Sequence, residues 1–301
     1  MDVARIVTYT SPLILQPLSF MLSYQHGYHA GNFADVIKHL ALSRILHYLG
    51  QKDKALFYLE THSGRGLYDL RDGQATKTGE FRQGISLLWD KRDKLSPLMA
   101  PYLSVLKGLN PKGDLRYYPG SPCFALSLLR AQDRLTLAEL HPREFEQLEQ
   151  ISRQGKRVVF RNEDGIKEMN AALPPLERRG LTFVDPSYEI KDEYKTIPRA
   201  LHAANTRFST GVYCLWYPIV DNRLRDQLLR GMLTINPERS LRLEFYLTGA
   251  AQAGMTGCGL WIINPPHTLA AEMRTIMDEL RGLFNPGVSY YLIEEGKKIT
   301  V

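Results

Sequence analysis

LTFVDPSY, residues 181–188, places an acid, a proline and a tyrosine directly after an apolar run. The run has the length and character of a strand buried on both faces, and a proline does not continue the pairing of a central strand. The stretch therefore predicts a buried strand that ends in the carboxylate of Asp185, with the rigid Pro186 and an exposed Tyr188 ring just beyond it.

Similar apolar runs recur on both sides of this one, and helical patterns separate most of them. Such alternation predicts an α/β protein with a mostly parallel sheet covered on both faces. The last two runs lack a helix between them and are expected to pair as a hairpin, and a helix is expected over 33–50 after a capping Asn32. The seven expected strands cover 55–61, 135–140, 157–162, 181–185, 211–217, 241–247 and 260–264.

One gap, between 55–61 and 135–140, is longer than a strand-helix-strand unit needs. Residues 65–116 within it hold helical patterns and ten Lys or Arg against six acids, a local charge of +4. We expect an inserted small helical subdomain here, and a sheet domain formed by 21–64 and 117–301. The insert's basic surface would suit RNA phosphates, although a solvated helical face has the same composition.

Bulk properties narrow the class of protein. A net charge of +6 over 301 residues suits a polyanionic partner without requiring one. Three distant cysteines without a CxxC pair indicate neither a disulfide framework nor a zinc site. Two prolines interrupt the apolar residues 1–20, so we expect an N-terminal extension and not a signal peptide. No stretch reaches the roughly 18 apolar residues of a membrane span, and a cytoplasmic protein is expected.

The residues that follow the strands are the candidates for a site, because ligands of open α/β sheets bind outside the carboxyl ends of strands. ETHSGRG, 60–66, is rich in small residues that let a ligand approach the backbone, but it is not GxGxxG. Glu139 follows the second strand, where an acid commonly holds ribose hydroxyls, and Asp164 with Gly165 follows the third. Each feature alone has a plainer explanation, as a turn or a helix cap.

The end of the 181–185 strand suits methylation of an exocyclic amine. The amine of adenine or cytosine is a poor nucleophile, because its lone pair is delocalised into the ring. A site that methylates it must accept its hydrogen bonds and take up its developing positive charge. Asp185 and the carbonyl of Pro186 can do both from fixed positions, and the Tyr188 ring can stack on an unstacked base.

DPSY resembles the (D/N)PP(Y/F/W) motif of S-adenosylmethionine-dependent amino-methyltransferases. With four further blocks, the chain resembles the bacterial large-subunit (23S) ribosomal RNA adenine-N6 methyltransferase J family from Met21 to near the C terminus. The resemblance implies a Rossmann-like class I methyltransferase that acts as a monomer on one adenine of large-subunit RNA, with S-adenosyl-L-methionine as cofactor. The blocks are MLSYQHGYHAGNFADVIKH (21–39), YLETHSGRG (58–66), LRYYPGSP (115–122), AELHP (138–142) and RRGLTFVDPSYE (178–189).

The resemblance also implies roles at the substrate. Asp185 would be the proton acceptor, while Tyr24, Pro186 and Tyr188 would contact the RNA. Ser187 departs from the pattern, because the family has a second proline there, and it loosens the loop that aims the Pro186 carbonyl.

A second group would line the cofactor. Glu139 suits the ribose hydroxyls, Asp164 suits the adenine amine of the cofactor, and Ser121, ahead of a helix, suits its carboxylate. For the two histidines only the resemblance indicates a role. The implied cofactor residues are His39, His62, Ser121, Glu139, Asp164 and Gly165.

Other interpretations stay open. Residues 264–267, NPPH, fit the first three motif positions better, but they come late in the order and lack the ring, so we expect a structural strand end. His26 and His29 with Asp35 and His39 could form a metal site, although no metal is expected. A DNA adenine-N6 or cytosine-N4 methyltransferase shares the tetrapeptide chemistry, and a non-catalytic RNA-binding protein could share the fold.

Overall fold

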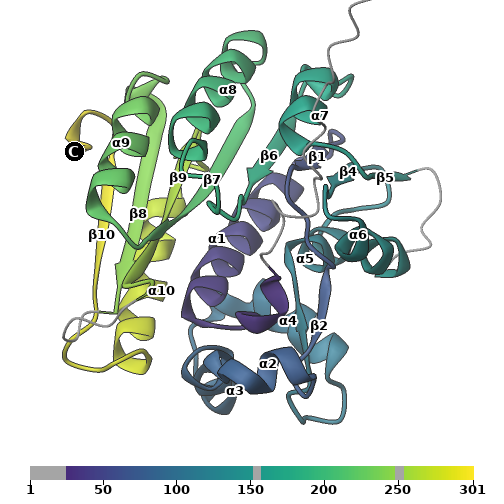
Figure 1. Cartoon of the computed structure of the whole chain (residues 1–301), viewed down its shortest axis with the longest axis vertical. Helices are drawn as coiled ribbons and strands as arrows, with labels where there is room; N and C mark the ends of the chain where they lie inside the picture. Colours follow the sequence, from purple (N-terminus) through teal and green to yellow (C-terminus); the bar gives the residue numbers. More distant parts are fainter. Residues whose placement is uncertain (1–24, 152–156, 248–253) are drawn as a thin grey trace, which may run out of the picture.

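The computed structural model describes residues 25–151, 157–247 and 254–301. Within them, eight strands form one sheet in the order β10-β8-β9-β7-β6-β1-β4-β5, with helices on both faces (Figure 1). The strands of this sheet are β1 (Phe57–Glu60), β4 (Arg134–Ala138), β5 (Val158–Arg161), β6 (Gly180–Val184), β7 (Val212–Ile219), β8 (Ser240–Tyr246), β9 (Gly257–Ile263) and β10 (Tyr290–Glu295). The helices are α1 (Phe33–Gly50), α2 (Gly73–Thr78), α3 (Ile85–Lys91), α4 (Ala100–Leu109), α5 (Ser121–Leu128), α6 (Pro142–Leu148), α7 (Gly165–Ala172), α8 (Glu193–Arg207), α9 (Asn222–Met232) and α10 (Leu269–Leu283).

The strand directions confirm the predicted α/β sheet and the hairpin. β5, β4, β1, β6 and β7 are parallel neighbours, and β9 runs antiparallel between β7 and β8. The predicted number of seven strands is wrong, because β10 pairs antiparallel with β8 at the edge. Residues 290–293 of β10, YYLI, are a short apolar run that the sequence interpretation did not count as a strand, and in the structure none of the residues of β10 is fully buried.

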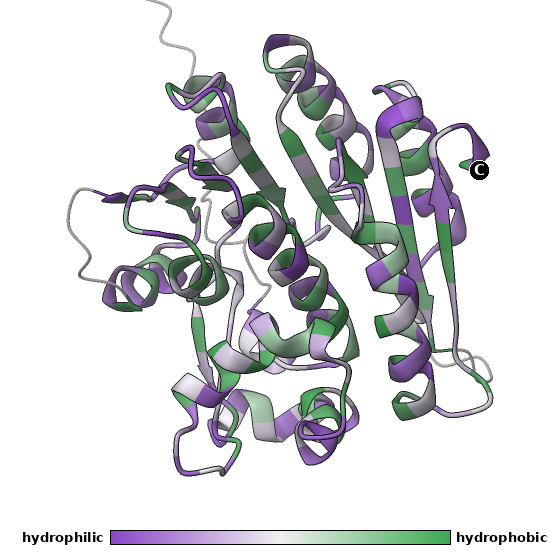
Figure 2. Ribbon diagram, turned by 180° about the vertical axis from the view of Figure 1, so that it is seen from behind, coloured by the Kyte–Doolittle hydropathy of each residue, from purple (hydrophilic) through white to green (hydrophobic). Residues whose placement is uncertain are grey.

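Helices cover the two faces of the sheet in separate layers. Side chains alternate along a strand, so Tyr58 of β1 points into the core under α1, α5 and α10, whereas Phe57 and Leu59 point toward α7, α8 and α9. Figure 2 shows the apolar residues concentrated along the central strands between these layers. Within the described residues, no helix combines the length and apolar character needed to cross a membrane.

Helix α1 is unusually enclosed. Asn32 caps it, since its side chain accepts a hydrogen bond from the Asp35 N–H at 2.9 Å, which confirms the predicted helix over 33–50. Fifteen of its eighteen residues are buried, among them the polar Lys38 and His39. A helix that is buried on most sides places polar side chains inside the protein, where each needs a partner.

Residues 65–116 form α2, α3 and α4 together with a short strand, β2 (Leu67–Asp69). β2 pairs antiparallel with β3 (Tyr117–Pro119), which returns the chain to the sheet. The apolar side chains of α3 and α4 belong to the same hydrophobic cluster as those of α1. This segment therefore extends the core on the α1 side (Figure 1, bottom).

The strand order reverses between β1 and β6. The chain builds β4 and β5 on one side of β1 and then crosses to place β6 on the other side. Glu60 at the end of β1 lies opposite Phe183 of β6, and the Thr61 N–H donates to the Phe183 carbonyl at 3.1 Å. Residues that follow the two strands therefore meet at the position where open α/β sheets bind their ligands.

Candidate active site

Asp185 follows β6 directly, and its carboxylate contacts a buried lysine. Lys38 Nζ donates to Asp185 Oδ2 at 2.7 Å and lies 2.9 Å from Oδ1 of Asp35. The side chains of Lys38 and Asp185 are 5% and 13% exposed. Burial lowers the pKa of Lys38, but the Asp185 and Asp35 carboxylates outweigh it and leave that pKa above its ordinary value. The lysine stays charged and fixes the direction of the Asp185 carboxylate.

A second carboxylate holds the other side of the lysine. Asp35 Oδ2 is 2.8 Å from His26 Nε2 and accepts the Gly31 N–H at 2.9 Å. Burial acts to raise the pKa of Asp35, but His26 and Lys38 together hold it well below its usual range. His26, Asp35 and Lys38 thus form a buried polar chain that ends at Asp185.

The histidines named for a possible metal site contact different partners. His29 Nδ1 lies 2.9 Å from Glu80, and His39 Nδ1 lies 2.8 Å from the Tyr118 hydroxyl. Nowhere in residues 25–151, 157–247 and 254–301 do three or more His, Cys, Asp or Glu side chains converge as metal ligands.

The Tyr188 ring is not exposed, and this expectation from the sequence is wrong. The residue is 7% exposed, its ring packs against Tyr194 and Trp216, and its hydroxyl donates to the Trp216 carbonyl at 2.9 Å. Tyr188 has a φ of 55°, a left-handed conformation that is rare for a bulky residue. The loop after Asp185 turns sharply there and packs the ring against β7. Tyr24, the other predicted RNA contact, lies outside the described residues.

At the end of β1, Glu60 forms a buried pair with Ser121. Glu60 is fully buried, and it accepts hydrogen bonds from the Ser121 hydroxyl and, at 3.0 Å, from the Tyr58 hydroxyl. Burial raises the pKa of Glu60 to about 8. Ser121 is the first residue of α5, as the sequence suggested, and the contact with Glu60 fixes its hydroxyl at the strand ends.

Two buried polar atoms beside these residues have no hydrogen-bond partner within the described part of the chain. They are Nε2 of His39 and Oγ of Ser63. Burial holds the pKa of His39 well below its usual range, so its imidazole is neutral. Burial likewise lowers the pKa of His62 to about 4. Because buried polar groups are nearly always paired, a polar ligand bound at the strand ends would satisfy these two atoms.

Glu139 lies at the end of β4 and contacts the loop after β1. Its two oxygens accept backbone N–H groups, from Gly64 and from His141, each at 2.7 Å. Burial raises the pKa of Glu139, and these two hydrogen bonds oppose the rise. A carboxylate that already holds two backbone groups has a fixed position, and its remaining lone pairs can accept ribose hydroxyls.

Asp164 caps α7, so it has the structural role of a helix cap that the sequence analysis gave as the plainer explanation. Its Oδ1 accepts the Ile166 N–H at 2.9 Å. The next residue, Gly165, has no room for a side chain, because a Cβ there would lie 1.9 Å from the Thr61 carbonyl oxygen. The start of α7 is therefore pressed against the loop after β1, with the second oxygen of Asp164 left for a ligand.

These residues fit S-adenosylmethionine. The buried free atoms of His39 and Ser63, together with Ser121, suit the polar groups of an amino acid. Glu139 suits a ribose, and Asp164 beside a closely packed glycine suits the flat edge of an adenine. Ser63, Glu139 and Asp164 follow the neighbouring strands β1, β4 and β5 in one row beside Asp185, while His39 comes from α1 and Ser121 from the start of α5.

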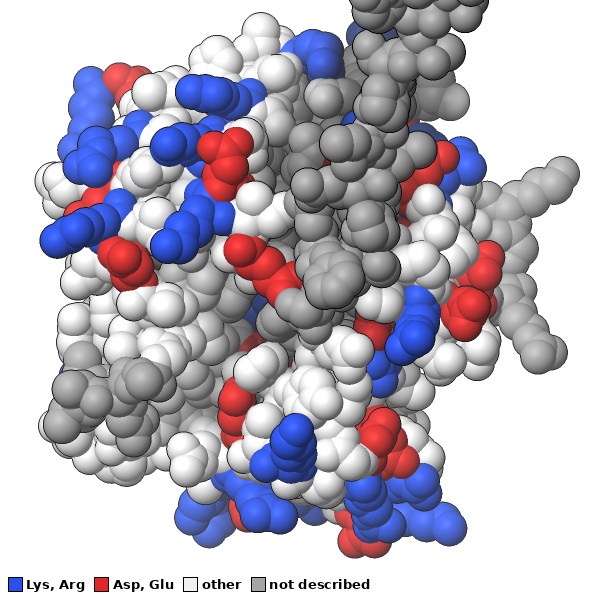
Figure 3. All heavy atoms as spheres, in the orientation of Figure 1, with Lys and Arg blue, Asp and Glu red and all other residues white. Residues whose placement is uncertain are grey.

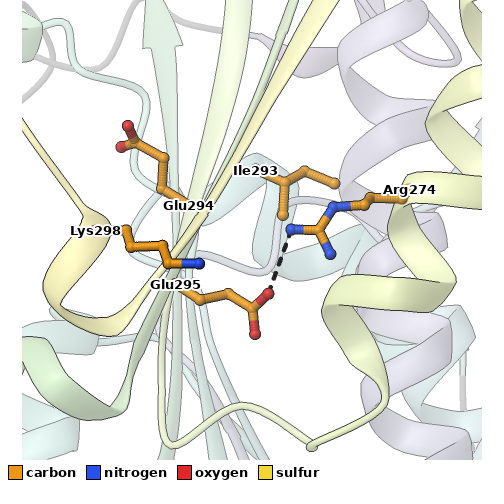
Figure 4. A pocket seen from close by; sticks show the side chains of 5 residues that line it. All are labelled: Arg274, Ile293, Glu294, Glu295 and Lys298. Carbon is orange, nitrogen blue, oxygen red and sulfur yellow. Dashed lines mark hydrogen bonds and ion pairs between the residues drawn. The ribbon is translucent and has the colours of Figure 1, made fainter.

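Other candidate features lie away from this row. β9 runs antiparallel to its neighbours, so residues 264–267 end at the opposite edge of the sheet. There Asn264 donates to the Ser209 and Gly211 carbonyls, which confirms the prediction of a structural strand end. Figure 4 shows a small hollow between α10 and β10, where Arg274 donates to Glu295 at 3.3 Å. Its other lining residues are Ile293, Glu294 and Lys298.

Comparisons with known proteins agree with this geometry. The family model described as "Ribosomal RNA large subunit methyltransferase D, RlmJ" matches residues 53–289. The chain belongs to this family. Ribosomal RNA large subunit methyltransferase J of Haemophilus influenzae is 42% identical over 277 residues, which cover 91% of this chain and 98% of the relative. The protein of the same name from Escherichia coli is 40% identical over 267 residues, covering 88% and 95%.

A solved structure shares the fold of this chain. It is protein LPL1258 from Legionella pneumophila, with 51% identity and a TM-score of 0.86, covering 90% of this chain and all of that one. The family is one of methyltransferases, and S-adenosylmethionine is their cofactor. Lys38, Glu60 and Ser63 lie among the residues of this candidate site, although the sequence interpretation did not single them out. Their only signal was their place beside predicted residues, in VIKH and ETHSG.

The pH dependence of folding tests the environment of Glu60. The folded carboxyl keeps its proton up to about pH 8, whereas its ordinary value of 4.5 applies when the chain is unfolded. The free energy of unfolding therefore has the full contribution of this group below pH 4.5 and loses it as the pH rises to 8, by about 1.4 kcal/mol per pH unit. Glu60→Gln removes this loss, because an amide does not ionise.

Urea unfolding of wild type and Glu60→Gln at pH 5, 6.5 and 8 measures the difference. We expect the stability of the variant relative to wild type to increase from pH 5 to 6.5 and again from pH 6.5 to 8. Glu149→Gln, which removes an exposed carboxylate, is the matched control. A difference between wild type and Glu60→Gln that is constant over this pH range would contradict the assignment.

Proposed function

We propose that the protein transfers a methyl group from S-adenosylmethionine to the N6 amine of one adenine in large-subunit ribosomal RNA. The observation that carries this proposal is the Asp185 carboxylate, which is oriented by Lys38 at 2.7 Å and stands beside the row of cofactor-compatible residues. Membership in a family of ribosomal RNA large-subunit methyltransferases supports the class of substrate.

The cofactor would be held at the ends of β1, β4 and β5 by the residues described above. When bound there, it supplies an electrophilic methyl group on a good leaving group. The remaining catalytic work is to position the amine and to exclude water from it. The residues proposed to hold the cofactor are His39, His62, Ser63, Ser121, Glu139, Asp164 and Gly165.

At the substrate, Asp185 and the Pro186 carbonyl would accept hydrogen bonds from N6. They draw density onto the nitrogen as it attacks, and Asp185 takes its proton afterwards. Lys38 keeps the carboxylate in one direction during this step. The base must leave its stack to reach this position, and we propose that Tyr24 and Tyr188 hold it. Because the Tyr188 ring is buried, the loop after Asp185 must open one of its faces when RNA binds.

We further propose that residues 65–116 act as an RNA-binding subdomain between the two parts of the sheet domain, 21–64 and 117–301. Three of its ten cations have acidic partners: Arg65 with Glu144, Lys107 with Asp93 and Arg116 with Asp69. The others have no ion pair within the described residues, so they are available to phosphates. A monomer in the cytoplasm, where ribosomes assemble, fits this role.

Transfer of labelled methyl to RNA tests the function. Protein-free large-subunit RNA lacking its modifications is incubated with the enzyme and labelled S-adenosylmethionine, and its nucleosides are then separated. We expect label in N6-methyladenosine alone. Label in another nucleoside would mean that the enzyme methylates a different target. If a parallel reaction with DNA gave label and the reaction with RNA gave none, the substrate would be DNA. RNA binding without label would indicate a non-catalytic RNA-binding protein.

A further inference from the structure

Helices α8 and α9 carry a second cationic surface, separate from residues 65–116. Together they hold six Lys or Arg against two acids, the same excess of four positive charges in about half as many residues. In Figure 3 these side chains gather over the two helices at the upper left, while those of the 65–116 segment lie at the bottom. We call it the α8–α9 surface; its exposed cations are Lys195, Arg199 and Arg207 of α8 and Arg223 and Arg230 of α9. The exposed residues Lys191 and Asp192 precede α8, and the exposed Asp221 precedes α9.

Most of these cations have no acidic partner. Of the cations on α8 and α9, only Arg225 forms an ion pair within the described residues, with the adjacent Asp226 at 2.7 Å. Lys195 and Arg199 are four residues apart, so they lie on the same face of α8, and Arg223 and Arg230 lie on one face of α9. The acids of this region lie in the first halves of the two helices, at Glu193 and Asp226, or directly before them, at Asp192 and Asp221, so the cations still outnumber the acids and the surface suits an external anion.

A groove between the two helices runs through the surface. Lys195, Arg199 and His202 line it from α8, and Gln227 and Thr234 line it from α9 and the residues after it. The helices approach closely because residue 231 is glycine, and a Cβ there would lie 2.8 Å from Pro198 Cβ. The groove therefore has a floor of packed backbone and a rim of cations and hydrogen-bond donors. That combination suits a sugar-phosphate backbone.

The α8–α9 surface also shares an edge with the catalytic site. β6 and β7 are parallel neighbours, so the helices that follow them both begin at the edge where Asp185 lies. α8 begins eight residues after Asp185, and Arg199 lies about 9 Å along its axis from its start. A nucleic acid strand with one base at Asp185 has its neighbouring phosphates within reach of this surface.

We propose that the α8–α9 surface binds the phosphate backbone of the substrate RNA beside the target adenine, opposite to the contact made by residues 65–116. This inference rests on the proposed function, since it takes the substrate to be RNA. The two cationic surfaces then hold the RNA on both sides of the catalytic site, and the α8–α9 surface contributes affinity without choosing the base.

The double variant Lys195→Gln/Arg199→Gln tests the proposal, because it removes two cations and keeps the helix-forming character of α8. Its control is Lys52→Gln/Lys54→Gln, which removes the same charge from exposed residues before β1, at the opposite edge of the sheet. Affinity for unmodified large-subunit RNA is measured at several salt concentrations. We expect the α8 variant to bind at least about ten-fold more weakly and to lose about two units from the slope of log K against log salt, and the control to change little.

Turnover separates this proposal from the proposed function. If wild type methylates the RNA, we expect the α8 variant to show a raised KM for RNA with kcat and cofactor affinity unchanged. Equal RNA affinity and salt slope in both double variants would overturn the α8–α9 surface while leaving the function intact. No methyl transfer by wild type would overturn the function itself. The single variants Lys195→Gln and Arg199→Gln give the same comparison, at about half the effect, if the double variant does not fold.

Discussion

Asp185→Asn is expected to reduce methyl transfer to RNA by a factor of about 1,000 or more, while the affinity for S-adenosylmethionine changes less than about three-fold. The amide keeps the shape of the carboxylate but loses its charge, so it neither stabilises the developing positive charge on N6 nor accepts its proton. Losses of about 100- to 10,000-fold are usual when such a group is removed. Single-turnover transfer of labelled methyl measures the rate, and calorimetric titration measures the affinity for the cofactor.

Asp221→Asn is the matched control, because Asp221 also follows a strand of the sheet and caps a helix but is exposed. We expect it to transfer methyl at nearly the wild-type rate. A similar loss of cofactor affinity and of turnover in Asp185→Asn would instead make Asp185 a residue of the cofactor site. Retention of most activity would remove it from the catalytic role.

Lys38→Met is expected to lower both stability and turnover. The variant removes the cation from between two carboxylates. Asp35, which is 2% exposed, then lacks the lysine with which it forms an ion pair. Breaking a buried ion pair from one side costs about 3–5 kcal/mol, because the remaining charge stays buried. Urea unfolding at pH 7 measures this change. Turnover falls as well, because Asp185 loses the group that fixes its direction.

The double variant Asp35→Asn/Lys38→Met separates structure from catalysis. Neutralising Asp35 as well removes the more deeply buried of the two carboxylate charges that Lys38 had paired, and the amide oxygen that replaces this carboxylate can still accept the Gly31 N–H. Part of the lost stability should therefore return, although Asp185 stays without its cation. If Lys38 orients Asp185, turnover stays low in this stable protein. Recovery of wild-type turnover together with stability would show that Lys38 serves folding alone.

Local sequence patterns were sufficient for most of the fold and for part of the site. The helix after Asn32 and the strand before Asp185 follow from periodicity and capping, and these depend on neighbours in the sequence. β10 was not predicted although it contains the apolar run YYLI, because a run of four apolar residues does not by itself distinguish a strand from other structure. For Glu139 and Asp164, position after a predicted strand was enough to place them at one edge of the sheet, whereas Ser121 was singled out by the family resemblance and by its place ahead of a helix.

Contacts between distant segments could not be predicted in this way. Lys38 is separated from Asp185 by 147 residues, and nothing in VIKH indicates that α1 presents this lysine to the end of β6. The same reason explains Tyr188. Its exposure was inferred from its place in a loop, but Trp216, from the next strand, covers the ring. Burial of an individual side chain depends on the packing of the whole sheet.

The position of α1 has a practical consequence for fragments of this protein. The segment matched by the family model begins at residue 53 and contains Asp185 and Glu139, but α1 ends at Gly50. A fragment cut at that boundary would retain every strand of the sheet and the DPSY tetrapeptide. It would lack Lys38 and His39, and it would expose the apolar face of the sheet that α1 covers. Any shortened form of this enzyme must therefore keep the helix that precedes its first strand.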